Sequence, residues 1–342
     1  MTASLATAPA ALALTKRPRI GFLGVGWIGR HRMQAMLETG LVEAAAVADP
    51  SHEMMAEALK LAPDAEPASG LEALLAQDLD GVVIATPSAL HAAQSIQALE
   101  AGVSVFCQKP LGRTEAEVRA VVEAARRADR LLAVDLSYRF TEGMQRIRDL
   151  IVAGELGEPF AADLVFHNAY GPDKPWFYDP ALSGGGCVMD LGVHLVDLAL
   201  WALDFPRVGR VSSSLVAGGA PLDGRTDTVE DYAVATLDLE SGAVVRVACS
   251  WRLQAGCDAD ISAAFYGTGG GALMRNVGGS FYDFTTERMA GNSRETISAP
   301  PEAWGGRAAA DWARRLAAGE GFDPENERLI EVTRVLDRIY GR

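Results

Sequence analysis

The sequence predicts an α/β protein of two domains: an N-terminal parallel sheet covered by helices, and a C-terminal α/β domain with a large, mostly antiparallel open sheet. Three observations lead to this prediction. A glycine-rich turn near the N-terminus joins an apolar strand to an apolar-periodic helix. Short helices and strands then alternate to about residue 153, and long strands with alternating side chains follow from about residue 158. With 342 residues, the chain is long enough for two hydrophobic cores.

The glycine-rich turn lies within residues 19–31 and predicts the dinucleotide-binding turn of a Rossmann domain. Gly24, Gly26 and Gly29 fill the pattern G-x-G-x-x-G. In this pattern the first glycine allows a sharp turn, the second lets the backbone approach a pyrophosphate, and the third lets helix pack on strand. The helix expected over 27–37 presents free N–H groups and a positive dipole end to that pyrophosphate. The alternative is a glycine-rich turn that binds nothing.

Asp49 ends the second expected strand and stands 20 residues after Gly29. This is close to the spacing at which a carboxylate accepts hydrogen bonds from the adenosine ribose, and a 2′-phosphate would meet the same anion. Positions 50–53 carry no Arg or Lys. We therefore expect NAD rather than NADP as the cofactor, although Arg30 and Arg32 could partly offset the anion.

The rest of the first half alternates helix and strand, which predicts a parallel sheet with crossover helices. The strand over 80–87 is apolar, as a central parallel strand is, and Pro87 ends it. The helices expected after Asp49 cover 51–61, 71–76, 88–101, 114–129 and 142–153, and the further strands cover 103–107 and 131–134.

From about residue 158 the pattern changes to long strands joined by hairpin-like turns. The expected strands cover 160–168, 208–216, 232–239, 243–251, 261–267 and 280–286. One strongly apolar helix, 187–203, interrupts them, and two helices, 303–318 and 324–340, finish the chain. We therefore divide the chain into a disordered arm 1–17, a dinucleotide-binding domain 18–140, a substrate and oligomerisation domain 141–323, and a C-terminal helix 324–342 that returns to the first domain.

Composition and charge exclude several classes of partner. The formal net charge of −14 repels a nucleic-acid backbone and an anionic membrane surface. No run reaches the ~18 apolar residues that span a bilayer, and Lys16 and Arg17 follow the apolar part of the N-terminus, which is the wrong order for a secretory signal. The four cysteines show neither C-x-x-C pairing nor zinc-type spacing with histidine. We therefore expect reduced thiols, no metal site and a cytoplasmic location.

Lys109 is the first candidate for chemistry. It follows the strand 103–107, at the edge of a parallel sheet where ligands bind. Pro110 biases it towards an extended conformation, which fixes the direction of its side chain. The alternative is an ordinary surface lysine before a loop.

Asp190 and His194 form the second candidate. They stand four residues apart in the expected helix and so lie on one face of it, in apolar surroundings where a buried charge needs a partner. A histidine beside a carboxylate titrates near neutrality and suits general acid or base catalysis. Alternatively, Asp190 caps the helix after the glycines 184–186, and His194 is a hydrogen-bonded core histidine.

Together these motifs resemble the glucose-fructose oxidoreductase, inositol dehydrogenase and rhizopine-catabolism (Gfo/Idh/MocA) family. The matching features run in order along the chain: the glycine turn, Asp49, Thr86-Pro87 with His91, Lys109-Pro110, Tyr138-Arg139-Phe140, the glycines 184–186, and Asp190 with His194. The family has Glu before the lysine-proline pair, whereas this chain has Gln108. The amide keeps hydrogen bonding but loses a negative charge beside Lys109.

The resemblance implies a Rossmann domain joined to an α/β domain whose open sheet forms a dimer or tetramer interface, with the substrate between the domains. It implies a catalytic triad around a secondary alcohol, in which His194 takes the hydroxyl proton, Lys109 polarises the oxygen and Asp190 orients its neighbours. It implies NAD contacts at Gly24, Gly26, Trp27, Ile28, Gly29, Asp49, Thr86, Pro87, His91, Gln108 and Lys109.

Hydrogen-bonding and aromatic residues in three places are candidates for contact with a sugar or cyclic polyol: two near the expected sheet edge, five before the glycines 184–186, and two at a strand end. They are Tyr138, Arg139, His167, Asn168, Tyr170, Lys174, Trp176, Trp251 and Arg252. For each of them, ordinary loop or strand composition is the alternative.

The leading hypothesis is an NAD-dependent dehydrogenase that transfers hydride between a secondary alcohol of a sugar, inositol or related polyol and the nicotinamide. One alternative is a glycoside hydrolase or epimerase-like enzyme in which NAD is oxidised and reduced within one cycle. Another is a non-catalytic dinucleotide-sensing regulator, which need not keep Lys109, Asp190 and His194 together. The expected partners are a small sugar or polyol and further copies of this chain, as a homodimer or homotetramer, and neither nucleic acid nor a membrane.

Overall fold

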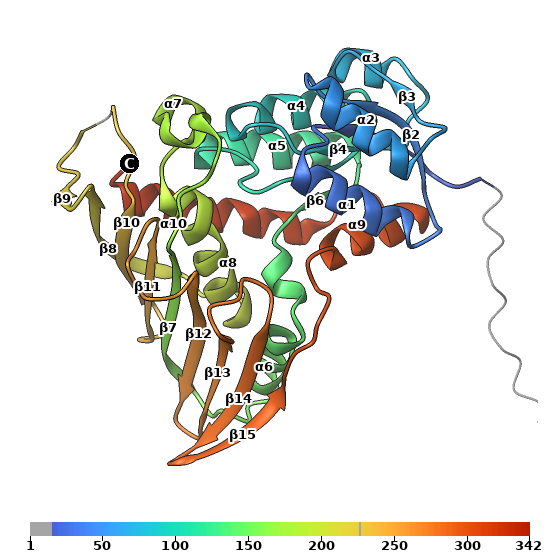
Figure 1. Ribbon diagram of the computed structural model, residues 1–342. Coiled ribbons are helices and arrows are strands. Elements are labelled where there is room, and N and C mark those ends of the chain that lie inside the picture. Colours follow the sequence, from blue (N-terminus) through green and yellow to red (C-terminus); the bar gives the residue numbers. More distant parts are fainter. Residues whose placement is uncertain (1–15, 226) are drawn as a thin grey trace, which may run out of the picture.

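The computed structural model describes residues 16–225 and 227–342. The arm expected at 1–17 lies outside the described residues except for Lys16 and Arg17. The described chain forms two sheets with helices packed between and around them (Figure 1). This architecture confirms the predicted fold class.

The first sheet is parallel, with strand order β3-β2-β1-β4-β5-β6. Its strands are β1 (Arg19–Leu23), β2 (Glu43–Ala48), β3 (Glu66–Pro67), β4 (Gly81–Ile84), β5 (Ser104–Cys107) and β6 (Leu132–Val134). Its connecting helices are α1 (Trp27–Leu37), α2 (His52–Leu61), α3 (Leu71–Leu75), α4 (Ser88–Glu100) and α5 (Glu115–Ala128). The strand order reverses between β1 and β4, and ligands of such sheets bind at the carboxyl ends of the strands beside this point.

Capping side chains explain where α2 and α5 begin. The side chain of Ser51 accepts a hydrogen bond from the N–H of Met54 at 3.3 Å and caps α2. Thr114 caps α5 in the same way through the N–H of Glu117 at 3.2 Å. Because capping side chains satisfy N–H groups that the helix leaves free, these residues fix the first turn.

The second sheet has nine strands in the order β15-β14-β13-β12-β7-β11-β10-β8-β9. They are β7 (Pro159–Asn168), β8 (Val208–Ala217), β9 (Ala220–Pro221), β10 (Tyr232–Leu239), β11 (Val244–Ser250), β12 (Ala259–Gly267), β13 (Gly271–Asn276), β14 (Phe284–Ala290) and β15 (Ser293–Ser298). Strands β7 and β11 pair in parallel, and the other neighbours pair antiparallel. The sheet is therefore mostly antiparallel, as expected.

The prediction of a strand over 280–286 is wrong in its bounds, because the observed strand β14 covers Phe284–Ala290. The hydroxyl of Ser280 accepts the N–H groups of Tyr282 and Asp283 at 3.1 and 3.2 Å, so this segment turns before β14 begins. The strands β13 and β15 on either side were not expected. Hydroxyl groups that bond nearby backbone compete with the ladder of a strand.

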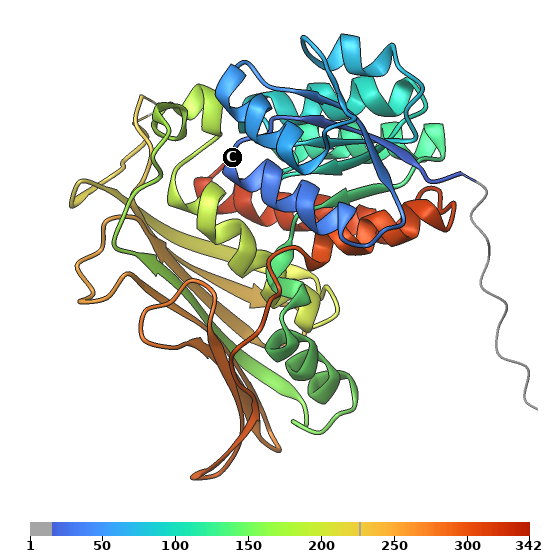
Figure 2. The same ribbon diagram turned by 45° about the vertical axis from the view of Figure 1, so that its right-hand side comes forward.

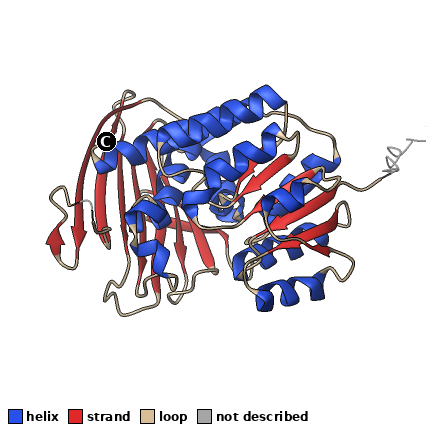
Figure 3. Ribbon diagram, turned by 90° about the horizontal axis from the view of Figure 1, so that it is seen from above, coloured by secondary structure: helices blue, strands red, loops and turns tan. Residues whose placement is uncertain are grey.

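Within the described residues, helices cover one face of the second sheet and leave the other face bare (Figures 2 and 3). They are α6 (Glu142–Val152), α8 (Val193–Ala202) and the last helix, α10 (Arg328–Tyr340). The side chains of β7 alternate accordingly: Leu164 and Phe166 are buried in the core against these helices, whereas Val165 and His167 lie on the bare face.

The apolar stretch 187–203, which the sequence predicts as one helix, consists of a π-helical turn η3 (Val188–Gly192) followed by α8. A short helix α7 (Pro180–Ser183) precedes it. The stretch Pro180–Ala202 is long and apolar enough to cross a membrane by length and composition, but 94% of its most apolar window is buried inside the protein. It is the core helix of the second domain.

The C-terminal segment differs from the expected domain division, which assigns residues to 323 to the second domain. Helix α9 (Arg307–Ala317) packs on the first sheet beside α1, because Trp312 and Ala309 join the core cluster of Phe22 and Phe106. Helix α10 bridges the domains: Ile330 packs in the first domain, whereas its later apolar residues, Val332, Val335, Leu336 and Ile339, pack in the second.

Trp312 is the largest buried side chain of α9, and its removal tests this packing. The side chain is fully buried, with its ring centroid 5.9 Å from that of Phe106. We expect Trp312→Ala to lower the free energy of unfolding by about 3–5 kcal/mol, because a large cavity opens in the core. Urea unfolding followed by circular dichroism measures the loss. Arg314→Ala, on the exposed side of the same helix, serves as the control, and equal stabilities of the two variants would contradict this account of the packing.

Candidate active site

The glycine turn between β1 and α1 leaves room beside its second glycine. A Cβ atom on Gly24, whose φ is +83°, would lie 2.5 Å from the carbonyl oxygen of Ala85, and one on Gly29 would lie 2.1 Å from the carbonyl oxygen of Gly24. These two glycines are needed for close packing. A Cβ on Gly26 would meet nothing within 4 Å, so open space adjoins the backbone where a pyrophosphate would approach the helix N-terminus. The turn fits a dinucleotide.

Asp49 lies at the end of β2, as the ribose assignment requires. One carboxylate oxygen accepts the N–H of Val25 and the other the N–H of Ser51, both at 2.8 Å. Each oxygen keeps a lone pair for a ribose hydroxyl. The two nearby arginines are engaged elsewhere: Arg30 donates to the carbonyl of Val25, and Arg32 forms a buried ion pair at the end of β6.

The other predicted cofactor residues line the same edge of the sheet. Trp27 is 64% exposed at the start of α1, and Ile28 beside it is half-buried. Thr86 and Pro87 form the turn between β4 and α4, where the Thr86 hydroxyl donates to the side-chain oxygen of Gln94 at 2.6 Å.

His91 is buried below this turn rather than exposed to a ligand. Its Nδ1 lies 2.6 Å from the carbonyl oxygen of Pro110, and its Nε2 lies 2.7 Å from that of Thr86. Burial lowers the pKa of His91, and the two carbonyls oppose that shift. The imidazole therefore ties the turn after β4 to the loop after β5.

Lys109 and Asp190 meet across the two domains. The Lys109 ammonium donates to a carboxylate oxygen of Asp190 and to its backbone oxygen, both at 2.7 Å. The second carboxylate oxygen of Asp190 accepts the indole N–H of Trp251 at 3.0 Å. Asp190 lies in the π-helical turn η3, a local geometry that is frequent at functional sites.

His194 lies one turn further along, in the first turn of α8, and is 7% exposed. Burial holds its pKa well below the usual range, and the positive charges of Lys109 and Arg32 lower it further. Its ring packs edge to face against Tyr138, with centroids 4.9 Å apart. The structure thus brings a neutral imidazole close to an ammonium and a carboxylate, which is the arrangement needed to take a proton from an alcohol and stabilise the oxygen.

The predicted substrate residues divide into two groups. The first group lies beside the site. Tyr138 packs against His194. Trp176 stacks on Phe177 with ring centroids 3.8 Å apart, and Phe177 contacts the ring of Trp251 edge to face. Burial raises the pKa of Tyr138, so its hydroxyl stays protonated and can donate a hydrogen bond. These aromatic residues are continuous with the site.

The structure does not bring the remaining candidates to the site as free groups. Arg139 forms a two-point ion pair with the buried carboxylate of Asp197. His167 lies on the bare face of the sheet, where its Nδ1 is 2.8 Å from the Ser250 hydroxyl. The remaining four candidates are engaged in loop contacts: Asn168 with the N–H of Tyr170, Tyr170 with Asp258, Lys174 with Asp173, and Arg252 with Tyr178.

Sequence reasoning missed Glu230, which anchors the start of the helical segment that carries Asp190 and His194. Its buried carboxylate accepts the N–H groups of Gly186 and Val188 at 3.0 and 2.8 Å and the Tyr340 hydroxyl at 2.8 Å. A Cβ on Gly186 would lie 1.9 Å from the Glu230 carbonyl oxygen. Burial raises the pKa of Glu230. No spacing in the sequence links residues 186 and 230, so no local signal pointed to this contact.

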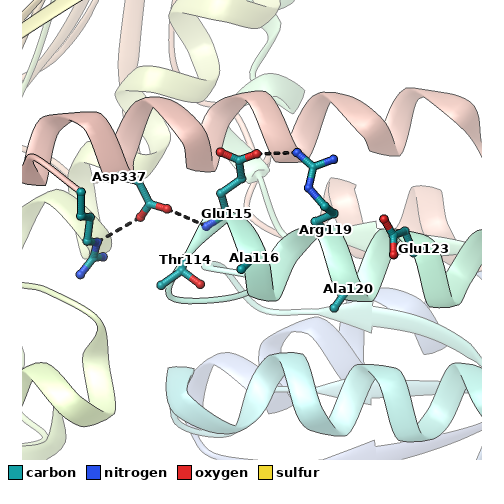
Figure 4. Close-up of a pocket in the computed structure, with 8 residues that line it drawn as sticks. Thr114, Glu115, Ala116, Arg119, Ala120, Glu123 and Asp337 are labelled. Atoms are coloured by element: carbon teal, nitrogen blue, oxygen red, sulfur yellow. Dashed lines mark hydrogen bonds and ion pairs between the residues drawn. The ribbon is translucent and has the colours of Figure 1, made fainter.

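A separate surface hollow of about 580 Å³ lies along α5 and the C-terminal residues (Figure 4). Its lining includes Glu115, Arg119 and Asp337, and Asp337 accepts the N–H of Glu115 at 2.8 Å. None of Lys109, Asp190 and His194 lines it. It is a surface hollow that lies apart from the site of the chemistry above.

Both domains of this chain match the domains of one known protein family. Residues 18–136 match an oxidoreductase family described by its NAD-binding Rossmann fold, and residues 144–273 match the GFO/IDH/MocA C-terminal domain. D-glucoside 3-dehydrogenase of Escherichia coli is 30% identical over 211 residues, which are 59% of this chain and 60% of that protein, less than two thirds of its length. Inositol 2-dehydrogenase 3 of Saccharopolyspora erythraea is 28% identical over 318 residues, 92% of this chain and 84% of that protein.

The fold is also that of a solved enzyme. The structure of levoglucosan dehydrogenase in complex with NADH and levoglucosan matches with a TM-score of 0.82 and 20% identity, covering 95% of this chain and 97% of that one. The resemblance drawn from the motifs is confirmed by both domain matches. The chain belongs to the GFO/IDH/MocA oxidoreductase family, with an NAD-binding Rossmann domain followed by the C-terminal domain of that family.

Proposed function

We propose that this protein is an NAD-dependent dehydrogenase that oxidises a secondary alcohol of a sugar, inositol or related polyol. The meeting of Lys109, Asp190 and neutral His194 at the edge of the dinucleotide-binding sheet carries the proposal. The names of relatives support it, since those proteins are dehydrogenases of a glucoside and of inositol. A regulator without catalysis would have no need of this arrangement.

Each residue has a distinct role in the proposed reaction. His194 takes the hydroxyl proton, because its low pKa keeps the imidazole neutral at physiological pH. Lys109 stabilises the negative charge that develops on the oxygen. Asp190 orients Lys109, and Trp251 fixes the carboxylate that does so. Bound NAD supplies the acceptor for the hydride.

The aromatic residues beside the triad suit a ring-shaped substrate. Tyr138 can donate a hydrogen bond next to His194, and the stacked pair of Trp176 and Phe177 offers an apolar face beside Trp251. Sugars and cyclic polyols combine hydroxyl groups with apolar C–H faces. The Tyr138 hydroxyl can therefore bond a hydroxyl group of such a ring, and the aromatic pair can pack on its C–H face. The four free thiols support our proposal that the protein works in the cytoplasm.

We further propose that the protein forms a dimer or tetramer through the bare face of the second sheet. Val165 lies at the middle of this face, between Ala248 and Ser262 on the neighbouring strands. Around them the face carries paired charges, such as Arg246 with Asp163. A large sheet face of mixed apolar and paired side chains suits burial against a second copy.

The first prediction tests the reaction itself. A panel of inositols, aldoses and sugar acids, scored by NADH absorbance, is expected to yield a substrate with net NADH formation. With that substrate, His194→Ala and Lys109→Ala should each lower kcat by roughly 10²–10⁴-fold, the usual size of a general acid or base contribution. Both variants should still bind NAD, because the glycine turn holds the pyrophosphate.

The exposed residues His52 and Lys60 on α2 give matched controls. His52→Ala and Lys60→Ala should turn over at the wild-type rate. Unchanged turnover in Lys109→Ala would mean that Lys109 is an ordinary loop lysine. Tightly retained NAD without net NADH would point instead to the redox-neutral alternative.

The second prediction concerns the choice of cofactor. In the proposed binding mode the Asp49 carboxylate accepts hydrogen bonds from the adenosine ribose hydroxyls and repels a 2′-phosphate, so kcat/KM should be higher for NAD than for NADP. Replacing Asp49 by Ser together with Pro50→Arg should shift the ratio of the two kcat/KM values towards NADP by at least roughly tenfold, the value of one charged hydrogen bond. Asp49→Asn, which keeps the size and removes the charge, should shift it less. A wild-type preference for NADP would overturn the Asp49 assignment.

The third prediction concerns assembly. Light scattering should give more than one chain per particle at micromolar concentration. Val165→Glu should reduce the particle to a monomer, because an unpaired charge in a buried interface is unfavourable. Val152→Glu is the control, since Val152 is 70% exposed on α6, on the helical side. A monomeric wild-type protein would rule out this proposal.

A further inference from the structure

Asp135 follows β6 and is 2% exposed, yet it bonds two side chains from distant parts of the first domain. Its Oδ2 atom accepts the Nε–H of Arg32 at 2.5 Å and the side-chain amide of Gln108 at 2.6 Å. Its Oδ1 atom is buried with no hydrogen-bond partner among the described residues. A buried acceptor left unpaired is unfavourable and therefore calls for an explanation.

The two partners of Asp135 come from the two parts of the first domain that are proposed to bind the cofactor and to carry the lysine. Arg32 lies on α1, which begins with the glycine turn. Gln108 directly precedes Lys109, and its backbone N–H donates to the carbonyl of Ile84 at the end of β4. Asp135 itself donates its N–H to the carbonyl of Cys107 at the end of β5. A single carboxylate thus ties the dinucleotide-binding helix to the strand end that carries the lysine.

The geometry explains why an amide, and not a carboxylate, stands at position 108. At 2.6 Å from Oδ2 of Asp135, the side chain of Gln108 must donate a hydrogen bond. A glutamate there would have no proton to donate, and two carboxylates at this distance repel each other. The negative charge lost at position 108, relative to the Glu of the family motif, is present on the neighbouring strand at Asp135.

The cluster of Asp135, Arg32 and Gln108 also affects the pKa of His194, the proposed base. The pKa of His194 is lowered by burial first and then by the charges of Lys109 and Arg32, the two cations that the Asp135 cluster holds in place directly or through Gln108. Three further titratable groups lie near His194. Tyr138 packs on its ring, Asp190 lies in the turn before it, and Asp197 lies three residues further along α8, paired with Arg139. Displacing Arg32 or Lys109 would therefore change the pKa of His194.

We propose that Asp135 is a positioning residue: by holding Gln108 and Arg32 through one oxygen, it fixes Lys109 against Asp190. The catalytic role of Lys109 belongs to the proposed function above, and the inference rests on it. The position of Lys109 is a property of the protein without substrate and can be measured separately.

The chain has only four lysines, which makes amine labelling a direct readout. The side chains of Lys16, Lys60 and Lys174 are 64–69% exposed, whereas that of Lys109 is 19% exposed and paired with Asp190. Acetylation of the protein without substrate, followed by mass spectrometry, gives the rate at Lys109 relative to the three exposed lysines.

Gln108→Glu replaces the donor that meets Oδ2 by a second carboxylate, whereas Asp135→Asn keeps an accepting oxygen but removes the negative charge that strengthens both hydrogen bonds. Each variant should speed labelling of Lys109 by roughly tenfold, as expected for loss of one charge-assisted hydrogen bond. The double variant Gln108→Glu/Asp135→Asn restores one carboxylate and one amide, and labelling should return towards the wild-type rate. Glu43→Gln, which removes a surface ion pair with Arg19 on the same sheet, should label as wild type. Gln108→Ala, which leaves Arg32 paired with Asp135, is a second test if a charge variant does not fold.

Equal labelling of Lys109 in wild type and all single variants would overturn the proposal, as would a double variant whose effect is the product of the two single effects. With an active substrate, the single variants should lose kcat by roughly 10²-fold, as displaced catalytic groups do, and the double variant should recover. If no sugar or polyol is oxidised but labelling changes as expected, the dehydrogenase proposal fails and the positioning role stands. If turnover is present and labelling is unchanged, the positioning role fails alone.

Discussion

The contact between Lys109 and Asp190 joins the two domains, and the arrangement of the site depends on it. The ammonium group comes from the end of β5, and the carboxylate comes from the π-helical turn that precedes α8. A largely buried cation needs an anion at hydrogen-bond distance. Asp190 supplies it, while Trp251 occupies the other oxygen. Because the contact crosses the domain boundary, the glycine turn and the base are brought together only when both domains pack as they do here.

Most of the first domain could be predicted because its local signals agree with its tertiary structure. The expected helix 27–37 has the bounds of α1, and the capping residues Ser51 and Thr114 mark the starts of α2 and α5. The far edge of the second sheet could not be predicted in the same way. Strand β15 is largely exposed and carries no alternation of apolar residues, so only its pairing with β14 makes it a strand.

Lys109, Asp190 and His194 could be singled out as site candidates because each lies in a compact motif, whereas the groups that hold them depend on contacts between distant segments. Arg139 lies in a family motif, but its guanidinium is taken up by Asp197, 58 residues away. Glu230 and Asp135 act through partners 44 and 103 residues away, Gly186 and Arg32 respectively. The orientation of His167, by contrast, could have been predicted. Neighbouring residues of a strand point to opposite faces, so once Phe166 is assigned to the core, His167 faces away from the helices.

The return of α9 to the first sheet makes the dinucleotide-binding domain discontinuous along the chain. One face of that sheet is covered by α1 and α2 together with Trp312 and its neighbours on α9. During synthesis on the ribosome, residues 18–136 therefore emerge long before the helix that completes their core. Domains usually fold as units while the chain emerges, but this one must wait for the second domain to be made, and no continuous fragment of the chain contains it alone.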